Sequence, residues 1–212
     1  MGLFITFEGP EGGGKTTQIK KLAMHLQTIG QDVVLTREPG GTSISEAIRD
    51  ILLDADNQAM DDRTELLLYA AARAQHVREV IIPALKSGKT VISDRFSDST
   101  LAYQGYGRGL DIDLIFQLNN IATKGLEPDL TILLDIDVKA GLQRVQDIQL
   151  GFDRLEGEKI EFHEKVRHGF LTLAKQYTKR IKLISAEQKP EEIFKKIVFE
   201  VNYVLGNHNR AE

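Results

Sequence analysis

The 212-residue sequence predicts an α/β fold in three layers, with a five-stranded parallel sheet between helices on both of its faces. Two observations lead to this prediction. Short apolar runs, typical of buried strands, alternate along the chain with longer stretches whose apolar residues recur at helical spacing. No internal repeat, low-complexity tract or linker divides the chain, and its length fits one domain over residues 1–212. Strand–helix alternation within one domain favours a parallel sheet, because every connection must cross back over the sheet.

The expected strands are short apolar runs bounded by polar residues or glycine. In chain order they are Leu3–Phe7, Val33–Leu35, Thr90–Ser93, Leu130–Leu134 and Ile181–Ile184. The expected helices are Gln18–Ile29, Ser45–Leu53, Arg63–Leu85, Asp113–Lys124 and the ranges 138–146, 158–179 and 190–204. Gly30, Gly88 and Gly125 follow three of these helices and mark their carboxyl ends. Residues 147–159 are polar and hold two glycines, so we predict a mobile lid there, with an ordinary surface loop as the alternative.

The composition excludes several classes of protein. Without cysteine, the chain has no disulfide framework, thiolate zinc site or cysteine nucleophile. The net charge of −4, from 27 basic and 31 acidic residues, argues against a nucleic-acid partner held by bulk charge. No apolar run reaches 18 residues and the first residues do not resemble a signal peptide, so we expect a cytoplasmic protein without a membrane partner.

The segment from Gly9 to Thr16 matches the phosphate-loop pattern G-x-x-x-x-G-K-[ST]. An apolar strand precedes it and an amphipathic helix follows, as in the P-loop NTPase type of fold. The loop amides and the helix amino end bind phosphate, Lys15 reaches the β- and γ-phosphates, and the Thr16 hydroxyl holds Mg²⁺. The motif alone indicates NTP binding, and the residues expected to bind the NTP are Gly9, Pro10, Glu11, Gly12, Gly13, Gly14, Lys15, Thr16 and Thr17.

Charged residues follow the strands at the sheet edge where ligands of such folds bind. Arg37 comes after the second strand and Arg95 after the third, and a guanidinium matches phosphate with two parallel hydrogen bonds. Asp94 is the expected carboxylate beside the metal, with Asp135 as its rival. Glu11 lies inside the loop, where a carboxylate is unfavourable next to phosphates unless a metal or a substrate hydroxyl offsets it.

Two further groups of side chains suggest a pocket for a second ligand. Tyr69 and Arg73 are four residues apart and share a helix face, where they either contact a base or belong to the core. The segment from Ser97 to Gln104 is rich in hydroxyl and amide groups, which either cap a helix or line a pocket for an uncharged polar group.

Together these segments resemble the thymidylate kinases, nucleoside-monophosphate kinases that phosphorylate dTMP with ATP. The resemblance runs in order from residue 3 to at least 156. It rests on Phe4–Gly9 with Lys15–Thr17, Thr36–Thr42, Leu66–His76, Asp94–Gly105 and Asp153–Glu156. The run Arg37-Glu38-Pro39-Gly40-Gly41 in combination with the other segments is its most specific part, since many families share the phosphate loop.

The resemblance implies a role for each candidate residue. Arg37 and Arg95 would bind the dTMP phosphate, and Tyr69, where the family usually has Phe, would stack on thymine. Arg73 would hydrogen-bond the base, Ser99 or Thr100 would read the thymine edge, and Gln104 would be a further dTMP-binding residue. Tyr103 would crowd the sugar 2′ position, and Glu11 would lie at the 3′-OH side. Arg154 would be the catalytic lid arginine, with Arg144 as a weaker candidate. The residues implied as catalytic are Lys15, Arg154, Arg95 and Glu11, and the metal-side residues are Thr16 and Asp94.

The implied reaction is direct in-line transfer from ATP to dTMP with Mg²⁺, giving dTDP for dTTP supply and DNA synthesis. The resemblance also implies a homodimer, to which residues 63–86 and 113–124 would contribute. Two alternatives are another nucleoside-monophosphate kinase and a non-catalytic NTP-binding switch. The chain contains no Asn-Lys-x-Asp-like run that would read guanine, which argues against a GTPase.

Overall fold

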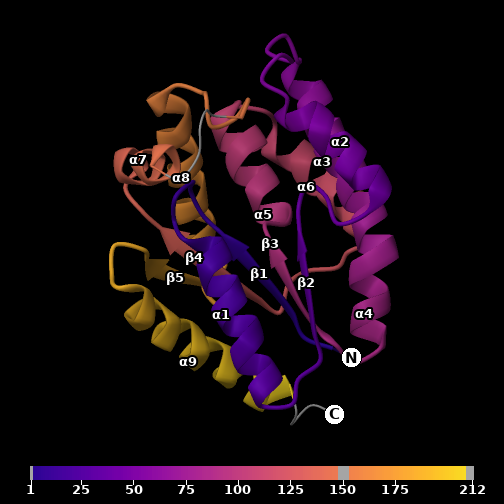
Figure 1. The fold of residues 1–212 in the computed structure, drawn as a ribbon. Coiled ribbons are helices and arrows are strands. Elements are labelled where there is room, and N and C mark those ends of the chain that lie inside the picture. Colours follow the sequence, from indigo (N-terminus) through magenta and orange to yellow (C-terminus); the bar gives the residue numbers. More distant parts are fainter. Residues whose placement is uncertain (1, 148–152, 209–212) are drawn as a thin grey trace.

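The computed structural model describes residues 2–147 and 153–208, and a parallel sheet runs through them (Figure 1). Its strands are β1 (Phe4–Glu8), β2 (Val33–Arg37), β3 (Thr90–Asp94), β4 (Leu130–Asp135) and β5 (Ile181–Ser185). They lie in the order β2-β3-β1-β4-β5, and every pairing is parallel. The predicted five-stranded sheet is confirmed, and the strands extend far enough to include Arg37, Asp94 and Asp135 as their last residues.

Helices cover both faces of the sheet, so the three predicted layers are confirmed. Figure 1 shows α1 (Lys15–Thr28) and α9 (Pro190–His208) side by side on one face. The other face carries α4 (Ile82–Lys86), α5 (Ser97–Thr100) and α8 (Ile160–Gln176), and α3 (Asp62–His76) packs against α6 (Ile112–Thr123) and α2 (Ser43–Leu53). Helix α7 (Val138–Gln146) follows β4 at its carboxyl end.

The central strand β1 is buried on both sides, which explains its apolar sequence. Ile5 and Phe7 face the core under α1 and α9. Phe4 belongs to the core on the opposite face, and Thr6 shares a hydrogen bond of 2.8 Å with Thr131 of β4. By the two-residue period of a strand, Glu8 points to the same side as Phe4 and Thr6. An acidic side chain is thereby directed into the buried region beneath α5.

The structure differs from the prediction in two helical regions. The expected helix Arg63–Leu85 is a continuous helical path, but a π-helical segment η1 (Val77–Ile81) separates α3 from α4. Pro83 explains this, because it has no N–H and its ring crowds the carbonyl four residues earlier, which a wider turn relieves.

The polar segment after β3 is helical as well, with α5 continuing into the π-helical segment η2 (Leu101–Gly107). Its glycines permit close packing, since a Cβ at Gly105 would lie 2.4 Å from Ile112 and one at Gly107 would lie 2.7 Å from Phe162. Of the two alternatives for this segment, the structure supports the pocket: Ser99, Thr100, Tyr103 and Gln104 line it, and among the described residues no side chain caps α5 or η2.

Candidate active site

The phosphate loop between β1 and α1 requires glycine at several positions. Gly9, Gly12 and Gly14 have φ values of 131°, 70° and 78°, in a region that other residues rarely adopt. A Cβ at Gly9 would lie 2.2 Å from the Leu134 carbonyl oxygen, and one at Gly12 would lie 2.1 Å from that of Gly141. The loop is therefore held closely against β4 and α7.

Lys15 lies within this loop and is almost completely buried. Its Nζ donates hydrogen bonds to the carbonyl oxygens of Gly9 (3.0 Å) and Pro10 (2.9 Å). Burial and the charge of Arg95 lower the pKa of Lys15. The loop borders a cavity of about 570 Å³, the phosphate-loop pocket, which is also lined by Thr16, Thr17, Arg37, Arg144 and Asp147.

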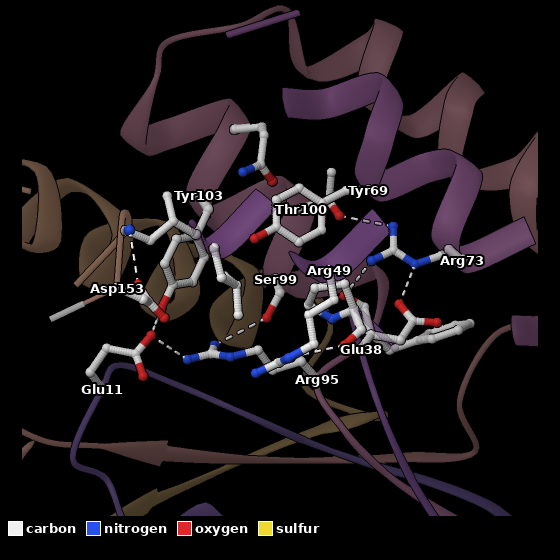
Figure 2. A pocket seen from close by; sticks show the side chains of 15 residues that line it. Glu11, Glu38, Arg49, Tyr69, Arg73, Arg95, Ser99, Thr100, Tyr103 and Asp153 are labelled. Carbon is white, nitrogen blue, oxygen red and sulfur yellow. Dashed lines mark hydrogen bonds and ion pairs between the residues drawn. The ribbon is translucent and has the colours of Figure 1, made fainter. Parts of the chain in front are cut away.

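A second cavity of about 100 Å³, the inner pocket, lies beyond the carboxyl end of β3 (Figure 2). It contains every residue that was assigned to the acceptor nucleotide except Arg37. These residues are Glu11, Tyr69, Arg73, Arg95, Ser99, Thr100, Tyr103 and Gln104. Three segments, separated by at least 22 positions in the sequence, thus meet around one small cavity.

Four residues, Glu11, Glu38, Arg49 and Arg95, line both pockets and so form a common wall. The sequence reasoning missed Arg49, which lies on α2 and donates to the Pro39 carbonyl oxygen at 2.9 Å. Neither a motif nor a strand end marks Arg49 in the sequence. Two cations at a common wall can hold a group that reaches from one pocket into the other.

Arg95 is the most firmly held of these cations (Figure 2). Its guanidinium donates to Glu11 at 2.6 Å, to the Gly9 carbonyl oxygen at 3.1 Å and to Ser99 Oγ at 3.2 Å. Tyr103 also donates to Glu11, at 2.6 Å. Burial raises the pKa of Glu11, but Arg95, Lys15 and the Tyr103 hydroxyl outweigh it and lower the pKa to about 2. Glu11 is therefore an ionised hydrogen-bond acceptor at neutral pH.

Arg73 is fully buried at the other end of the inner pocket. It donates to Glu38 at 2.7 Å, to Thr100 at 2.8 Å and to Asn119 at 2.7 Å. Glu38 in turn pairs with His76 Nδ1 at 2.9 Å. A buried guanidinium whose charge is matched in this way has a fixed orientation, which is what recognition of a planar ligand requires.

Arg37 and Arg154 lie outside the inner pocket. Arg37 is half exposed, pairs with Glu46 at 2.8 Å and lines the phosphate-loop pocket. Arg154 is buried, pairs with Glu65 at 2.6 Å and donates to the Leu52 carbonyl oxygen at 2.7 Å, and it lines neither pocket.

The predicted lid, residues 147–159, lies partly outside the described residues. Its described residues Asp153 and Leu155 border the inner pocket. Arg144 of α7 is nearer to the phosphate loop than its sequence position indicated. It donates to the Gly12 carbonyl oxygen at 3.3 Å and lines the phosphate-loop pocket.

The two candidate metal-side carboxylates differ in their partners. The Thr16 hydroxyl donates to Asp94 at 3.2 Å, beside the loop. Asp135 is engaged by Arg167 through two hydrogen bonds of 2.7 and 2.9 Å, and the Asp137 side chain caps the amino end of α7. A hydroxyl with one carboxylate suits Mg²⁺, which binds few protein oxygens and completes its shell with phosphate and water. The described residues accordingly contain no cluster of three or more metal-ligating side chains.

Comparison with known proteins adds to this geometry. A family model described as thymidylate kinase matches residues 7–197. The chain belongs to the thymidylate kinase family. The thymidylate kinase of Geotalea uraniireducens (strain Rf4) is 56% identical over 197 residues, covering 91% of this chain and 92% of the relative. That of Geobacillus sp. (strain WCH70) is 54% identical over 194 residues, with coverage of 91% and 92%.

The fold of this thymidylate kinase family member also matches a solved structure. The crystal structure of thymidylate kinase from Ehrlichia chaffeensis superposes with a TM-score of 0.77 at 39% identity and covers 94% of this chain and 98% of that one. The predicted family, P-loop fold and kinase activity are thereby confirmed. Family members use ATP with a divalent metal. In the described part of the chain, no helix combines the length and apolar character needed to cross a membrane.

Proposed function

We propose that the protein phosphorylates dTMP to dTDP with ATP, by direct in-line transfer between the two pockets. The observation that carries the proposal is the common wall of Glu11, Glu38, Arg49 and Arg95. A donor in the phosphate-loop pocket and an acceptor in the inner pocket meet at this wall with their phosphates facing each other. Proximity and orientation of this kind supply a large part of the rate enhancement in phosphoryl transfer.

On the donor side, the loop amides and Lys15 bind the ATP phosphates. Thr16 and Asp94 are the residues that hold Mg²⁺, which neutralises charge on the phosphates when bound. Lys15 is already desolvated, so its interaction with a phosphoryl oxygen is stronger than it would be in water.

On the acceptor side, Arg95 and Arg49 bind the dTMP phosphate, and Arg37 approaches it from the phosphate-loop pocket. Tyr69 stacks on the thymine ring. The sugar lies between Tyr103, which crowds its 2′ position, and the ionised Glu11, which accepts from the 3′-OH. The thymine edge faces Arg73, Ser99, Thr100 and Gln104.

In the transfer, a phosphate oxygen of dTMP forms a bond to the γ-phosphorus while the bond from that phosphorus to the bridging oxygen of ADP breaks. No enzyme nucleophile takes part. Lys15 stabilises the charge that develops on the transferred group. Arg154 supplies a further positive charge after it leaves Glu65, and Arg144 is placed to assist it.

A coupled assay of ADP release, with and without dTMP, tests the proposal. We expect release that depends on dTMP and a kcat/KM for dTMP above those for dUMP, UMP, AMP and CMP. The matched control pair is Lys15→Met, which removes the loop cation, and Lys20→Met, an exposed lysine on the same helix. ADP release at an equal rate without any monophosphate would instead indicate an NTP-binding switch.

The proposal includes a homodimer in the cytoplasm, where both nucleotides are available. Its support is the apolar outer surface of α3 and α6, on which Leu67, Leu114 and Ile121 are 55%, 42% and 73% exposed. Apolar side chains gathered on adjacent helices favour an interface between subunits. A sedimentation measurement should give twice the chain mass of 23.7 kDa.

A further inference from the structure

Glu8 is a buried carboxylate with no role in the chemistry above. It ends β1, is 1% exposed and points beneath α5. Its Oε1 accepts from the Phe96 backbone N–H at 2.7 Å, and its Oε2 lies 2.5 Å from Ser99 Oγ. Among the described residues, no lysine or arginine forms an ion pair with it. A carboxylate buried without a matching cation is costly, so its position demands a reason.

The first contact holds the turn that carries Arg95. Arg95 has a φ of 70°, a left-handed conformation that a residue with a Cβ adopts only when its surroundings impose it. Three hydrogen bonds hold this turn, from Arg95 N–H to the Phe7 carbonyl oxygen (2.9 Å), from Ser93 to the Arg95 carbonyl oxygen (2.8 Å) and from Phe96 N–H to Glu8. In these three hydrogen bonds, Glu8 provides the only side-chain group from the neighbouring strand β1, since Phe7 takes part through its backbone.

The second contact reaches the Arg95 side chain through Ser99. Ser99 Oγ accepts from Arg95 Nη1 at 3.2 Å and also lies against Glu8. Ser99 itself borders the inner pocket. The hydrogen-bonded chain from Glu8 to Ser99, Arg95 and Glu11 thus links the β1 strand end to the wall between the two pockets.

We propose that Glu8 is a positioning residue of the acceptor site, which holds the Arg95 turn and sets whether the Ser99 hydroxyl is a hydrogen-bond donor or acceptor toward the acceptor nucleotide. The inference rests on the proposed function, since the acceptor is taken to be dTMP. When Glu8 is protonated, its O–H donates to Ser99, and the Ser99 hydrogen is free to donate to the base. When Glu8 is ionised, Ser99 must donate to Glu8.

The groups around Glu8 favour its neutral form. Burial raises the pKa of Glu8, and the negative charge of Asp98 on α5 raises it further. Hydrogen bonds from Ser99 and the Phe96 N–H, together with the charge of Arg95, partly oppose this rise. The resulting pKa of Glu8 is about 8. Glu8 in turn raises the pKa of two further cations, Lys15 of α1 and Arg180 directly before β5. As the pH rises through this pKa, Ser99 loses its free hydrogen and a negative charge develops near the dTMP phosphate. The KM for dTMP therefore increases with pH.

Glu8→Gln tests the proposal, because the amide keeps an acceptor for Phe96 N–H and a fixed donor to Ser99, as protonated Glu8 does. The measurement is kcat and KM for dTMP at saturating ATP from pH 7 to 9, where the substrate phosphate, with a second pKa of about 6, stays doubly ionised. We expect the parent KM to rise about fivefold to tenfold while kcat changes less than twofold. The KM of Glu8→Gln should stay flat. Glu191→Gln, an exposed carboxylate on α9, is the matched control and should follow the parent.

A readout that does not depend on turnover separates this inference from the proposed function. Infrared difference spectra should contain a protonated-carboxyl band at pH 7 that decreases toward pH 9 and is absent from Glu8→Gln. Absence of that band in the parent, or identical KM profiles of the parent and Glu8→Gln, would overturn the role of Glu8. Failure of the parent to phosphorylate dTMP, with the band present, would contradict the proposed function only.

Discussion

The two pockets of the site share a wall, but they are built by different means. The phosphate-loop pocket centres on one continuous segment, residues 11–17, which includes three glycines. The inner pocket is assembled from side chains of α2, α3, α5, η2 and the residues after 152. A phosphate group can be recognised largely by one contiguous backbone segment with its lysine, whereas a particular acceptor requires side chains from several segments fixed in three dimensions.

The difference is also electrostatic. Two cations of the inner pocket are held by carboxylates, Arg95 by the partly buried Glu11 and Arg73 by the buried Glu38. The overall charge of −4 is consistent with this arrangement, because the positive charges are few and converge on one place. Lys15, Arg37 and Arg95 converge on the phosphate-loop pocket as the anion chemistry requires, and Arg154 does not.

The largest expected effect would come from Arg154, which lines neither pocket and would have to leave Glu65 to reach the transferred phosphoryl group. Arg154→Ala should lower kcat by about 10³-fold or more with little change in the KM for dTMP, because an arginine on the transferred phosphoryl group contributes mainly to the transition state. Steady-state kinetics measure this, with Arg144→Ala for comparison and thermal unfolding to register the loss of the Glu65 pair. A decrease below about tenfold would assign the catalytic charge to another residue.

An intermediate effect is expected for Arg95→Ala, which distinguishes acceptor binding in the inner pocket from donor binding in the phosphate-loop pocket. Arg95→Ala should raise the KM for dTMP by about 10- to 100-fold, the equivalent of one lost charged hydrogen bond, and leave the KM for ATP within about threefold. Arg37→Ala should have a smaller effect, since Arg37 is half exposed and paired with Glu46. If both variants affected dTMP equally, the distinction between the two cations would be wrong.

The smallest expected effect concerns Tyr69, which stands at the stacking position where the family usually has Phe. Tyr69→Phe should change the KM for dTMP less than about threefold, because the ring provides the stacking, while Tyr69→Ala should raise the KM about 5- to 100-fold. Binding of dTMP measured by calorimetry would compare the two. A large effect of Tyr69→Phe would assign recognition to the hydroxyl as well as the ring.

Much of the fold and the donor site could be predicted from local patterns. The strands, the main helices and the loop from Gly9 to Thr17 follow from periodicity and from glycine requirements that neighbouring residues impose. The helical character of residues 97–107 could not be predicted, because its two glycines and polar residues disfavour a helix and packing against α6 and α8 overrides that preference. The place of Arg49 in the site could not be predicted either, and Glu38 was part of a recognised run without an assigned role, because both roles depend on which pockets the side chains border.

By itself, the sequence determined the α/β class, the phosphate loop and, through resemblance, the family, because these features are encoded in contiguous segments. Only the tertiary structure decided which carboxylate accompanies Thr16, where Arg37 and Arg154 lie, and that Glu8 supports Arg95 from a strand 87 positions earlier. The physical reason is burial: a charged side chain finds its partner in the folded protein through space, and the cost of leaving it unpaired enforces that choice.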